Sequence, residues 1–73
     1  MANEDHLKIL KKGVNHWNKW RKKNPKLIPN LRNAFLSDRR LQHIDFQRTD
    51  LYRADLSGVN LCDSNLHRAD LSN

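Results

Sequence analysis

The sequence predicts a mainly β fold, in which a short parallel solenoid is capped by one N-terminal α-helix. Two observations predict this fold. An apolar residue recurs at every fifth place through residues 29–73, and a cationic segment with helical periodicity precedes that run. We expect the recurring side chains to form the structural core. They are Leu31, Leu36, Leu41, Phe46, Leu51, Leu56, Leu61, Leu66 and Leu71.

A period of five residues cannot be buried by a regular helix or by a straight strand. An α-helix advances about 100° per residue, so side chains at every fifth place would spiral over all of its faces. A straight strand alternates its faces with period 2, so the same side chains would point up and down by turns. A chain that bends once per block turns each leucine inward again, and successive coils then stack about 4.8 Å apart.

The other places of each five-residue block support this interpretation. From Ile44 onward, the residue two places before each central residue is small or β-branched, as a second inward position requires. From Asp45 onward, the residue directly before each central residue is Asp or Asn, and such side chains bond nearby backbone amides at bends. We therefore interpret Asp45, Asp50, Asp55 and Asp70 as bend-forming residues rather than as a carboxylate pair or calcium ligands.

The blocks TDLYR, ADLSG, VNLCD, SNLHR and ADLSN resemble the repeats of pentapeptide-repeat proteins. The resemblance implies a right-handed quadrilateral parallel β-helix with four blocks per coil, and therefore about two coils here. Leu31, Leu51 and Leu71 would share one face, and Phe46 would stack on Leu66. Some family members imitate DNA and bind DNA gyrase as long acidic rods. Two coils whose six Arg balance six Asp count against that role.

The first blocks depart from the repeat pattern. Phe35 replaces the Asp or Asn, and Arg39 occupies an inward place. Two interpretations of this stretch stay open. Either residues 29–43 are repeats like the others, or residues 30–38 form a short helix, because their apolar side chains also have helical spacing.

Residues 3–24 are predicted to form the capping helix, with Asn3 as its N-cap and Pro25 disfavouring helix in the residue before it. We expect its apolar side to cover the first coil, because an uncovered end would expose backbone groups and leucines. The run GVNHWNKWRKKNP, residues 13–25, resembles segments that precede the repeats in some bacterial family members. The expected cap residues are Leu10, Val14, Trp17 and Trp20.

The chain of 73 residues is expected to be one domain, with a capping helix at 3–24, a linker at 25–28 and nine repeats at 29–73. The net charge of +6 lies entirely ahead of the repeats. The lysines of the helix could bind anions, although a solvated face is the alternative. With the tryptophans on the opposite arc, bases would have nothing to stack on. The lysines are Lys8, Lys11, Lys12, Lys19, Lys22 and Lys23.

The sequence indicates no catalytic, metal or cofactor site. The four histidines have no ligand spacing with one another or with Cys62, so we interpret them as solvated. Cys62 is expected to be a passive surface thiol, and a single cysteine fits the reducing cytoplasm. No apolar run approaches the length of a membrane span. The histidines are His6, His16, His43 and His67.

These observations predict a non-enzymatic structural or protein-interaction module with no small-molecule substrate. The alternative is a weak binder of nucleic acid or of an anionic lipid surface through the lysines. The last coil is followed by nothing that would cover it. Either the chain is a piece of a longer repeat protein, or two chains meet end to end through Leu61, Leu66 and Leu71.

Overall fold

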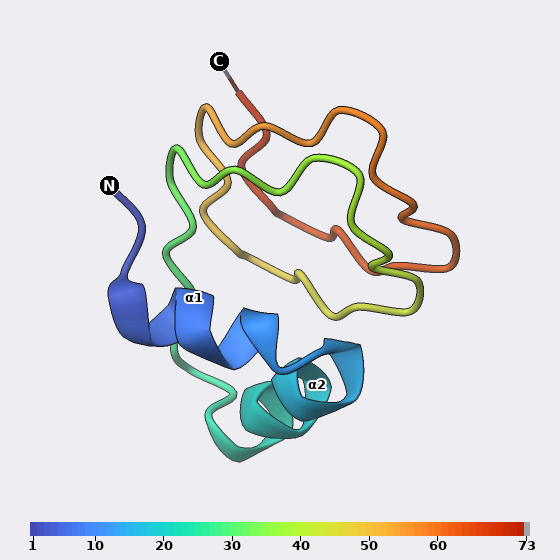
Figure 1. Ribbon diagram of the computed structural model, residues 1–73. Coiled ribbons are helices and arrows are strands. Elements are labelled where there is room, and N and C mark those ends of the chain that lie inside the picture. The colour runs from blue at the N-terminus through green and yellow to red at the C-terminus, as the bar shows by residue number, and fades with distance from the viewer. Residues whose placement is uncertain (73) are drawn as a thin grey trace.

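The computed structural model describes residues 1–72, so Asn73, the last residue of the ninth expected repeat, lies outside the described residues. Two helices, α1 (Glu4–Lys11) and α2 (Val14–Lys23), precede a run that winds around a common axis (Figure 1). We call residues 29–48 the lower coil and residues 49–68 the upper coil. The helices lie beneath the lower coil, and residues 69–72 continue above the upper coil.

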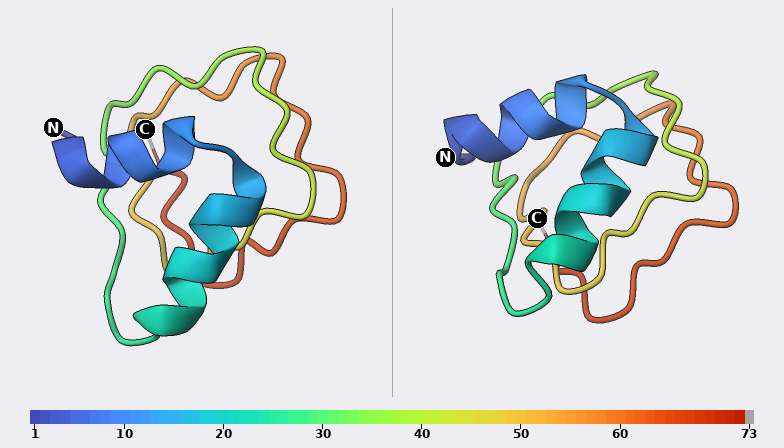
Figure 2. Two further views of the ribbon diagram at one scale, coloured as in Figure 1. Left: turned by 60° about the horizontal axis from the view of Figure 1, so that its bottom comes forward. Right: turned by 90° about the horizontal axis from the view of Figure 1, so that it is seen from below.

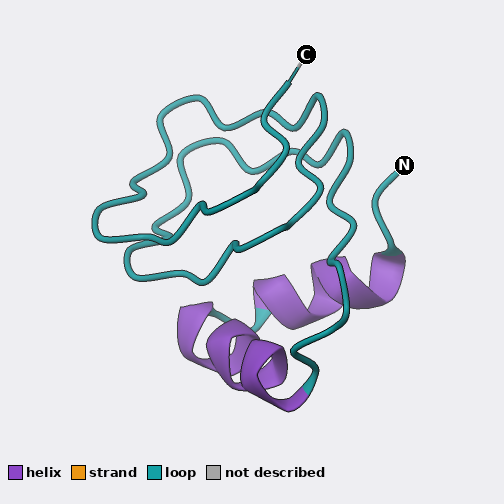
Figure 3. Ribbon diagram, turned by 180° about the vertical axis from the view of Figure 1, so that it is seen from behind, coloured by secondary structure: helices purple, strands orange, loops and turns teal. Residues whose placement is uncertain are grey.

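The predicted mainly β fold, a right-handed quadrilateral parallel β-helix, is wrong. Residues 1–72 contain two α-helices and no β-strand, as Figure 3 shows from behind. Isolated parallel bridges, each between single residues twenty positions apart, join the coils instead. These bridges are Asn30 with Asp50, Phe35 with Asp55, Arg40 with Asn60, Asp45 with Asn65 and Asp50 with Asp70.

The strands are missing because each block from residue 29 to residue 68 contains a left-handed residue that ends the extended backbone. In the blocks from 29 to 68, the last residue has φ between 58° and 68°. Extended backbone therefore never persists long enough for two successive residues to pair with the next coil. Residues 29–43 follow the same alternation of turn and bridge, so the alternative of a short helix over 30–38 is wrong.

Asp and Asn side chains complete most of these bends. In seven blocks the Asx oxygen accepts a hydrogen bond from the amide two residues further on, at 3.0–3.1 Å. Asp45 accepts from the amide of Gln47 in this way. Phe35 and Arg40 occupy the Asx place in the other two described blocks and make no such bond.

The single helix expected over residues 3–24 is divided in two at Gly13. Gly13 is the N-cap of α2 and has φ of 110°, a conformation that residues with a Cβ rarely adopt. The break sets α1 and α2 at an angle beneath the lower coil (Figure 2). One straight helix of about twenty residues would be about 30 Å long and would overhang one side of the coil.

Three side chains of α2 bind the backbone of the lower coil directly, and Trp17 and Asn18 are the first two. The Trp17 indole is fully buried, packs edge-on against Phe46, and donates from Nε1 to the carbonyl of Asp45 at 2.7 Å. Asn18 accepts from the amide of Asp45 at 2.8 Å and donates to the carbonyl of His43 at 3.0 Å. The Asn18 amide group therefore supplies the donor and acceptor that another coil would supply.

Arg21 also lies in this contact, although its charge is nearly buried. Its guanidinium donates to the carbonyls of Leu27 at 3.0 Å and Gln47 at 2.5 Å. Burial lowers the pKa of Arg21, and the neighbouring Asp45 partly opposes that shift. Arg21 thus ties the linker and the lower coil to α2 through backbone oxygens.

The helices α1 and α2 together form a lid beneath the lower coil. At the α1 end of this lid, the helix holds the first block, residues 29–33, through Asn30. The amide of Asn30 donates to Nδ1 of His6 at 3.0 Å, and its carbonyl accepts from the amide of Asn3 at 2.9 Å. The His6 ring also packs against Trp20, with 5.0 Å between centroids. Burial lowers the pKa of His6, while Asp5 opposes this effect. His6 is therefore half-buried and structural, not solvated as predicted.

Replacing Asn18 should test the backbone contacts of α2. We expect Asn18→Ala to lower the free energy of unfolding by about 1–3 kcal/mol, because it leaves an amide and a carbonyl without partners. Urea unfolding followed by circular dichroism measures this. The exposed Asn15→Ala on the same helix is the control and should change stability by less than about 0.5 kcal/mol. Equal losses in both variants would contradict the contact.

The His6 contact predicts a pH-dependent stability. The folded chain favours neutral His6, so the unfolded chain binds more protons between the lowered pKa and the ordinary value of 6.5. The stabilisation is therefore complete above pH 6.5 and is lost as the pH falls through the lowered pKa. Denaturant unfolding across this range should show a shallower pH slope in His6→Gln than in the wild type. The exposed His16→Gln should keep the wild-type slope, and an unchanged slope in His6→Gln would rule the effect out.

Candidate interaction surfaces

The upper coil has an open backbone edge. In the lower coil, the amide of each recurring leucine or phenylalanine donates to a carbonyl nineteen residues further on, at 2.8–2.9 Å. In the upper coil the amide of Leu51 still does so, because residues 69–72 lie above it. The amides of Leu56, Leu61 and Leu66 have no partner within residues 1–72. Three sides of the upper coil therefore keep unpaired backbone groups.

The side chains of the apolar core are most completely buried in the lower coil and become more exposed toward the open edge of the upper coil. Among the nine expected core residues, those of the lower coil are at most 3 % exposed and Leu51 is 1 % exposed. Leu56, Leu61 and Leu66 are only partly buried, and Leu71 is 49 % exposed. The buried members of the lower coil are Leu31, Leu36, Leu41 and Phe46.

The four expected cap residues lie in the lid in unequal positions. Leu10 and Trp17 are buried in the same apolar cluster as the lower coil, at 2 % and 0 % exposure. Val14 and Trp20 are partly buried at its margin. The lower coil is therefore covered on one side by the helices and on the other by the upper coil.

The lower coil has a second, partial open edge at residues 34–43. The amides of Phe35 and Arg40 have no partner among the described residues, whereas those of Asn30 and Asp45 bond to side chains of α1 and α2. Figure 2 shows the run 34–43 passing outside the two helices. The lid therefore pairs with two sides of this coil and leaves two free.

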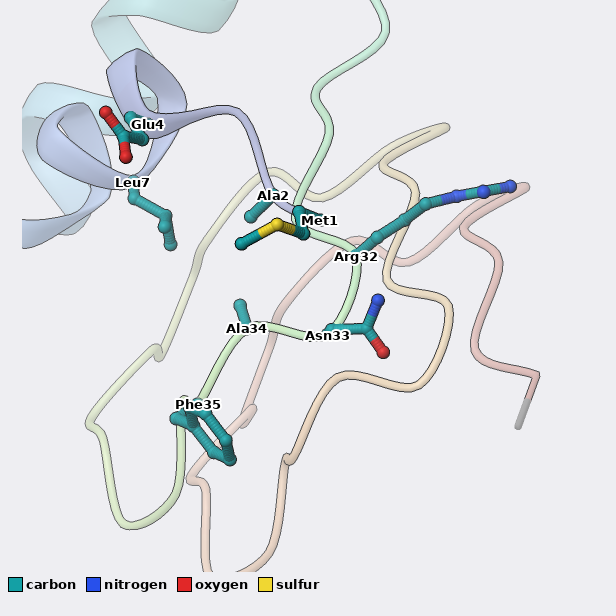
Figure 4. A pocket seen from close by; sticks show the side chains of 8 residues that line it. All are labelled: Met1, Ala2, Glu4, Leu7, Arg32, Asn33, Ala34 and Phe35. Carbon is teal, nitrogen blue, oxygen red and sulfur yellow. The ribbon is translucent and has the colours of Figure 1, made fainter.

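An apolar depression of about 350 Å³ adjoins this free edge. Figure 4 shows Leu7 on the helical side, Ala34 on the coil side, the side chain of Met1 between them, and Phe35 at the rim. Phe35 is 85 % exposed and Met1 97 % exposed, which is unusual for such large apolar side chains. The complete lining is Met1, Ala2, Glu4, Leu7, Arg32, Asn33, Ala34 and Phe35.

The six lysines predicted to bind anions are all exposed, but they do not share one helix face. The break at Gly13 places Lys8, Lys11 and Lys12 with α1, and places Lys19, Lys22 and Lys23 in α2. Among residues 1–72 the structure contains one ion pair, between Arg32 and Asp50. No lysine in this range is therefore paired with an acidic side chain.

Trp20 lies closer to the cations than the sequence predicts. The partly buried indole lines a depression of about 200 Å³ together with His16, Lys19 and Lys23. That bases would have nothing to stack on beside the lysines stays a prediction, although Trp20 shares this depression with Lys19 and Lys23. It assumed one continuous helix with Trp20 on the apolar arc, whereas α2 buries Trp17 and Arg21 and leaves Trp20 at the margin.

The remaining polar side chains form no chemical centre in the described structure. Within residues 1–72, no group of three His, Cys, Asp or Glu side chains is placed to hold a metal ion. Cys62 is exposed, with Sγ 3.8 Å from a carboxylate oxygen of Asp63. His16, His43 and His67 are exposed. Neither helix in this range is both long and apolar enough to cross a membrane.

Sequence comparison assigns the second half of the chain. Residues 40–73 match the family model for pentapeptide repeats in 8 copies. Comparison with curated proteins and with solved structures found no match. The matched region begins at Arg40, the second residue of the block that follows the one in which Phe35 replaces the Asx residue. Residues 40–73 of the chain therefore consist of pentapeptide repeats.

Proposed function

We propose that the chain is a non-enzymatic protein-interaction module that binds a second copy of itself through the open edge of the upper coil. The observation that carries this proposal is the coincidence of unpaired amides and incompletely buried leucines at Leu56, Leu61 and Leu66. An open backbone edge with apolar side chains beside it favours pairing with another chain. Leu71 extends the same apolar surface.

A second copy suits this edge because the edge is self-complementary. It carries unpaired amides, and also the carbonyls of Ala54, Val59 and Ser64, whose lower-coil counterparts accept hydrogen bonds from the coil above. Two copies related by a twofold axis would offer donors to acceptors in both directions. Their charges also favour this arrangement, since the repeats are neutral and the +6 segment of each chain lies at the opposite end.

Replacing Leu71 by a cation should disrupt the proposed dimer. Leu71 is 49 % exposed, so Leu71→Lys should leave the fold intact and place a charge in the contact. We expect the dissociation constant to rise at least about tenfold, measured by sedimentation equilibrium. Phe35→Lys makes the same change of charge at an exposed apolar residue of the lower coil and should leave the dimer unchanged. A wild-type chain that stays monomeric at high micromolar concentration would refute the proposal.

The depression at Trp20 supports a second candidate function, the weak binding of single-stranded nucleic acid. Bases stack on exposed aromatic rings, and lysines follow the phosphates. Here Trp20 stands between Lys19 and Lys23, and α2 contains no acidic residue. An anionic lipid surface is less favoured, because the apolar side of α2 is covered by the lower coil and cannot insert.

A labelled oligothymidylate tests this second function by fluorescence anisotropy. We expect affinity at low salt that falls steeply between about 50 and 200 mM salt. The double substitution Lys19→Ala and Lys23→Ala should weaken binding more than Lys8→Ala and Lys11→Ala, which remove the same charge from α1. Binding should also quench the fluorescence of Trp20, while buried Trp17 is spared. An absence of binding at low salt, or equal losses in both double variants, would exclude the site.

A further inference from the structure

Two consecutive blocks of the lower coil lack the side chain that closes the other bends. Seven blocks carry an Asx oxygen that accepts from the amide two residues on. In the blocks at 34–38 and 39–43, Phe35 and Arg40 stand in that place. The amides of Ser37 and Gln42 therefore have no hydrogen-bond partner within residues 1–72.

The same two blocks also lack a partner on the side facing the lid. In the upper coil, the amides of Asp55 and Asn60 donate to lower-coil carbonyls at 2.8 and 3.0 Å. The equivalent amides in the lower coil, those of Phe35 and Arg40, have no hydrogen-bond partner in α1 or α2 in the described structure. A row of unpaired amides along an accessible edge is a template for pairing with an extended chain.

The apolar depression, which would accept a side chain of a partner peptide, lies beside this edge. Phe35 projects into solvent at the rim of the apolar depression, which is lined deeper by Leu7 and Ala34 (Figure 4). A peptide that pairs with the edge would direct alternate side chains to one side of its own backbone. An apolar side chain directed toward Phe35 would cover its exposed ring and enter the depression.

The charges around the edge favour an acidic peptide. Arg40 is exposed, and Arg39 is partly buried in an inward place; neither forms an ion pair among residues 1–72. Lys8 and Lys11 line a depression that shares Glu4 and Leu7 with the apolar one. Cations therefore outnumber acids along this path, and Asp or Glu side chains of a partner would complement them.

We propose that residues 34–43 bind an extended peptide segment of a partner protein, with an apolar side chain seated at Phe35 and acidic residues on either side of it. The inference rests on the proposed protein-interaction role. It does not rest on self-association, because the upper edge and this lower edge are formed by different residues.

A displayed library of random peptides of about eight residues provides the probe. Selection uses the wild-type chain, and counter-selection uses the double variant Phe35→Asn and Arg40→Asn. That variant restores the Asx side chain of the other blocks, so it should fold at least as stably, as thermal unfolding will show. We expect selected peptides to share an apolar residue flanked by Asp or Glu, and to bind the wild type at least about tenfold tighter than the variant.

Two controls separate the site from general charge and from self-association. Arg68→Asn makes the same change as Arg40→Asn at another exposed residue of the coils and should retain binding. Leu71→Lys should also retain binding, whatever its effect on self-association. In the wild type, bound peptide should slow hydrogen exchange at the amides of Phe35 and Arg40, which are unpaired in the free chain.

Three results would overturn the proposal. The first is that no peptide is enriched over the counter-selection. The second is that selected peptides bind the double variant as tightly as the wild type, or leave both amides exchanging at the free rate. The third is that the double variant, and not Leu71→Lys, abolishes self-association, because the occupant of this edge would then be a second copy of the chain.

Discussion

Hydrogen bonds between successive coils are the constraint on which the rest of the structure depends. Each block offers only a few backbone groups along the stacking direction, and each group needs a partner above or below. Between the two coils these groups pair regularly, for example from Leu36 to Asp55 and from Asp55 to Ala34. A stack of about two coils has little interior relative to its ends, so the treatment of the ends dominates its properties.

The helical lid meets this constraint by using side chains in place of a coil. Asn18 offers a donor and an acceptor with the geometry of a peptide group, and Trp17 adds an N–H donor to a large apolar ring. His6 performs the same task at Asn30. Gly13 makes the arrangement feasible, because its left-handed backbone lets α1 and α2 address different sides of one coil.

Particular residues show how far the sequence could predict this structure. The recurrence at every fifth place includes the buried side chains of Leu31, Leu36, Leu41, Phe46 and Leu51. The Asx residues accept amide hydrogen bonds in seven of the blocks. The same periodicity could not show that a left-handed residue such as Arg48 or Arg53 would interrupt every extended segment, so the strands predicted from it are absent among residues 1–72. A projection of residues 3–24 as one helix could not reveal the break at Gly13.

The residues of the candidate sites also differ in how far a sequence pattern could predict their roles. Phe35 was visible as a departure from the repeat, but its significance depends on which amides the lid leaves unpaired. The sequence did not indicate the role of Asn18, because a single asparagine among several polar residues of a helix forms no periodic pattern. Trp20 packs against the apolar cluster as a cap residue and also lines a depression with Lys19 and Lys23, a proximity that depends on the direction of α2 after the break.

The distribution of unpaired groups also explains why interaction surfaces arise at two separate places. Wherever a block carries an Asx residue and lies between two partners, its backbone is satisfied, as at Tyr52, whose amide donates to the Asp50 carboxylate. Where either condition fails, polar backbone lies beside apolar side chains, and binding of the proposed partners would relieve both deficiencies together. Leu71 marks the failure at the upper edge and Phe35 the failure at the lower edge. Among residues 1–72, the unpaired groups therefore lie at the two ends of the stack, and the cationic helices lie at its lower end.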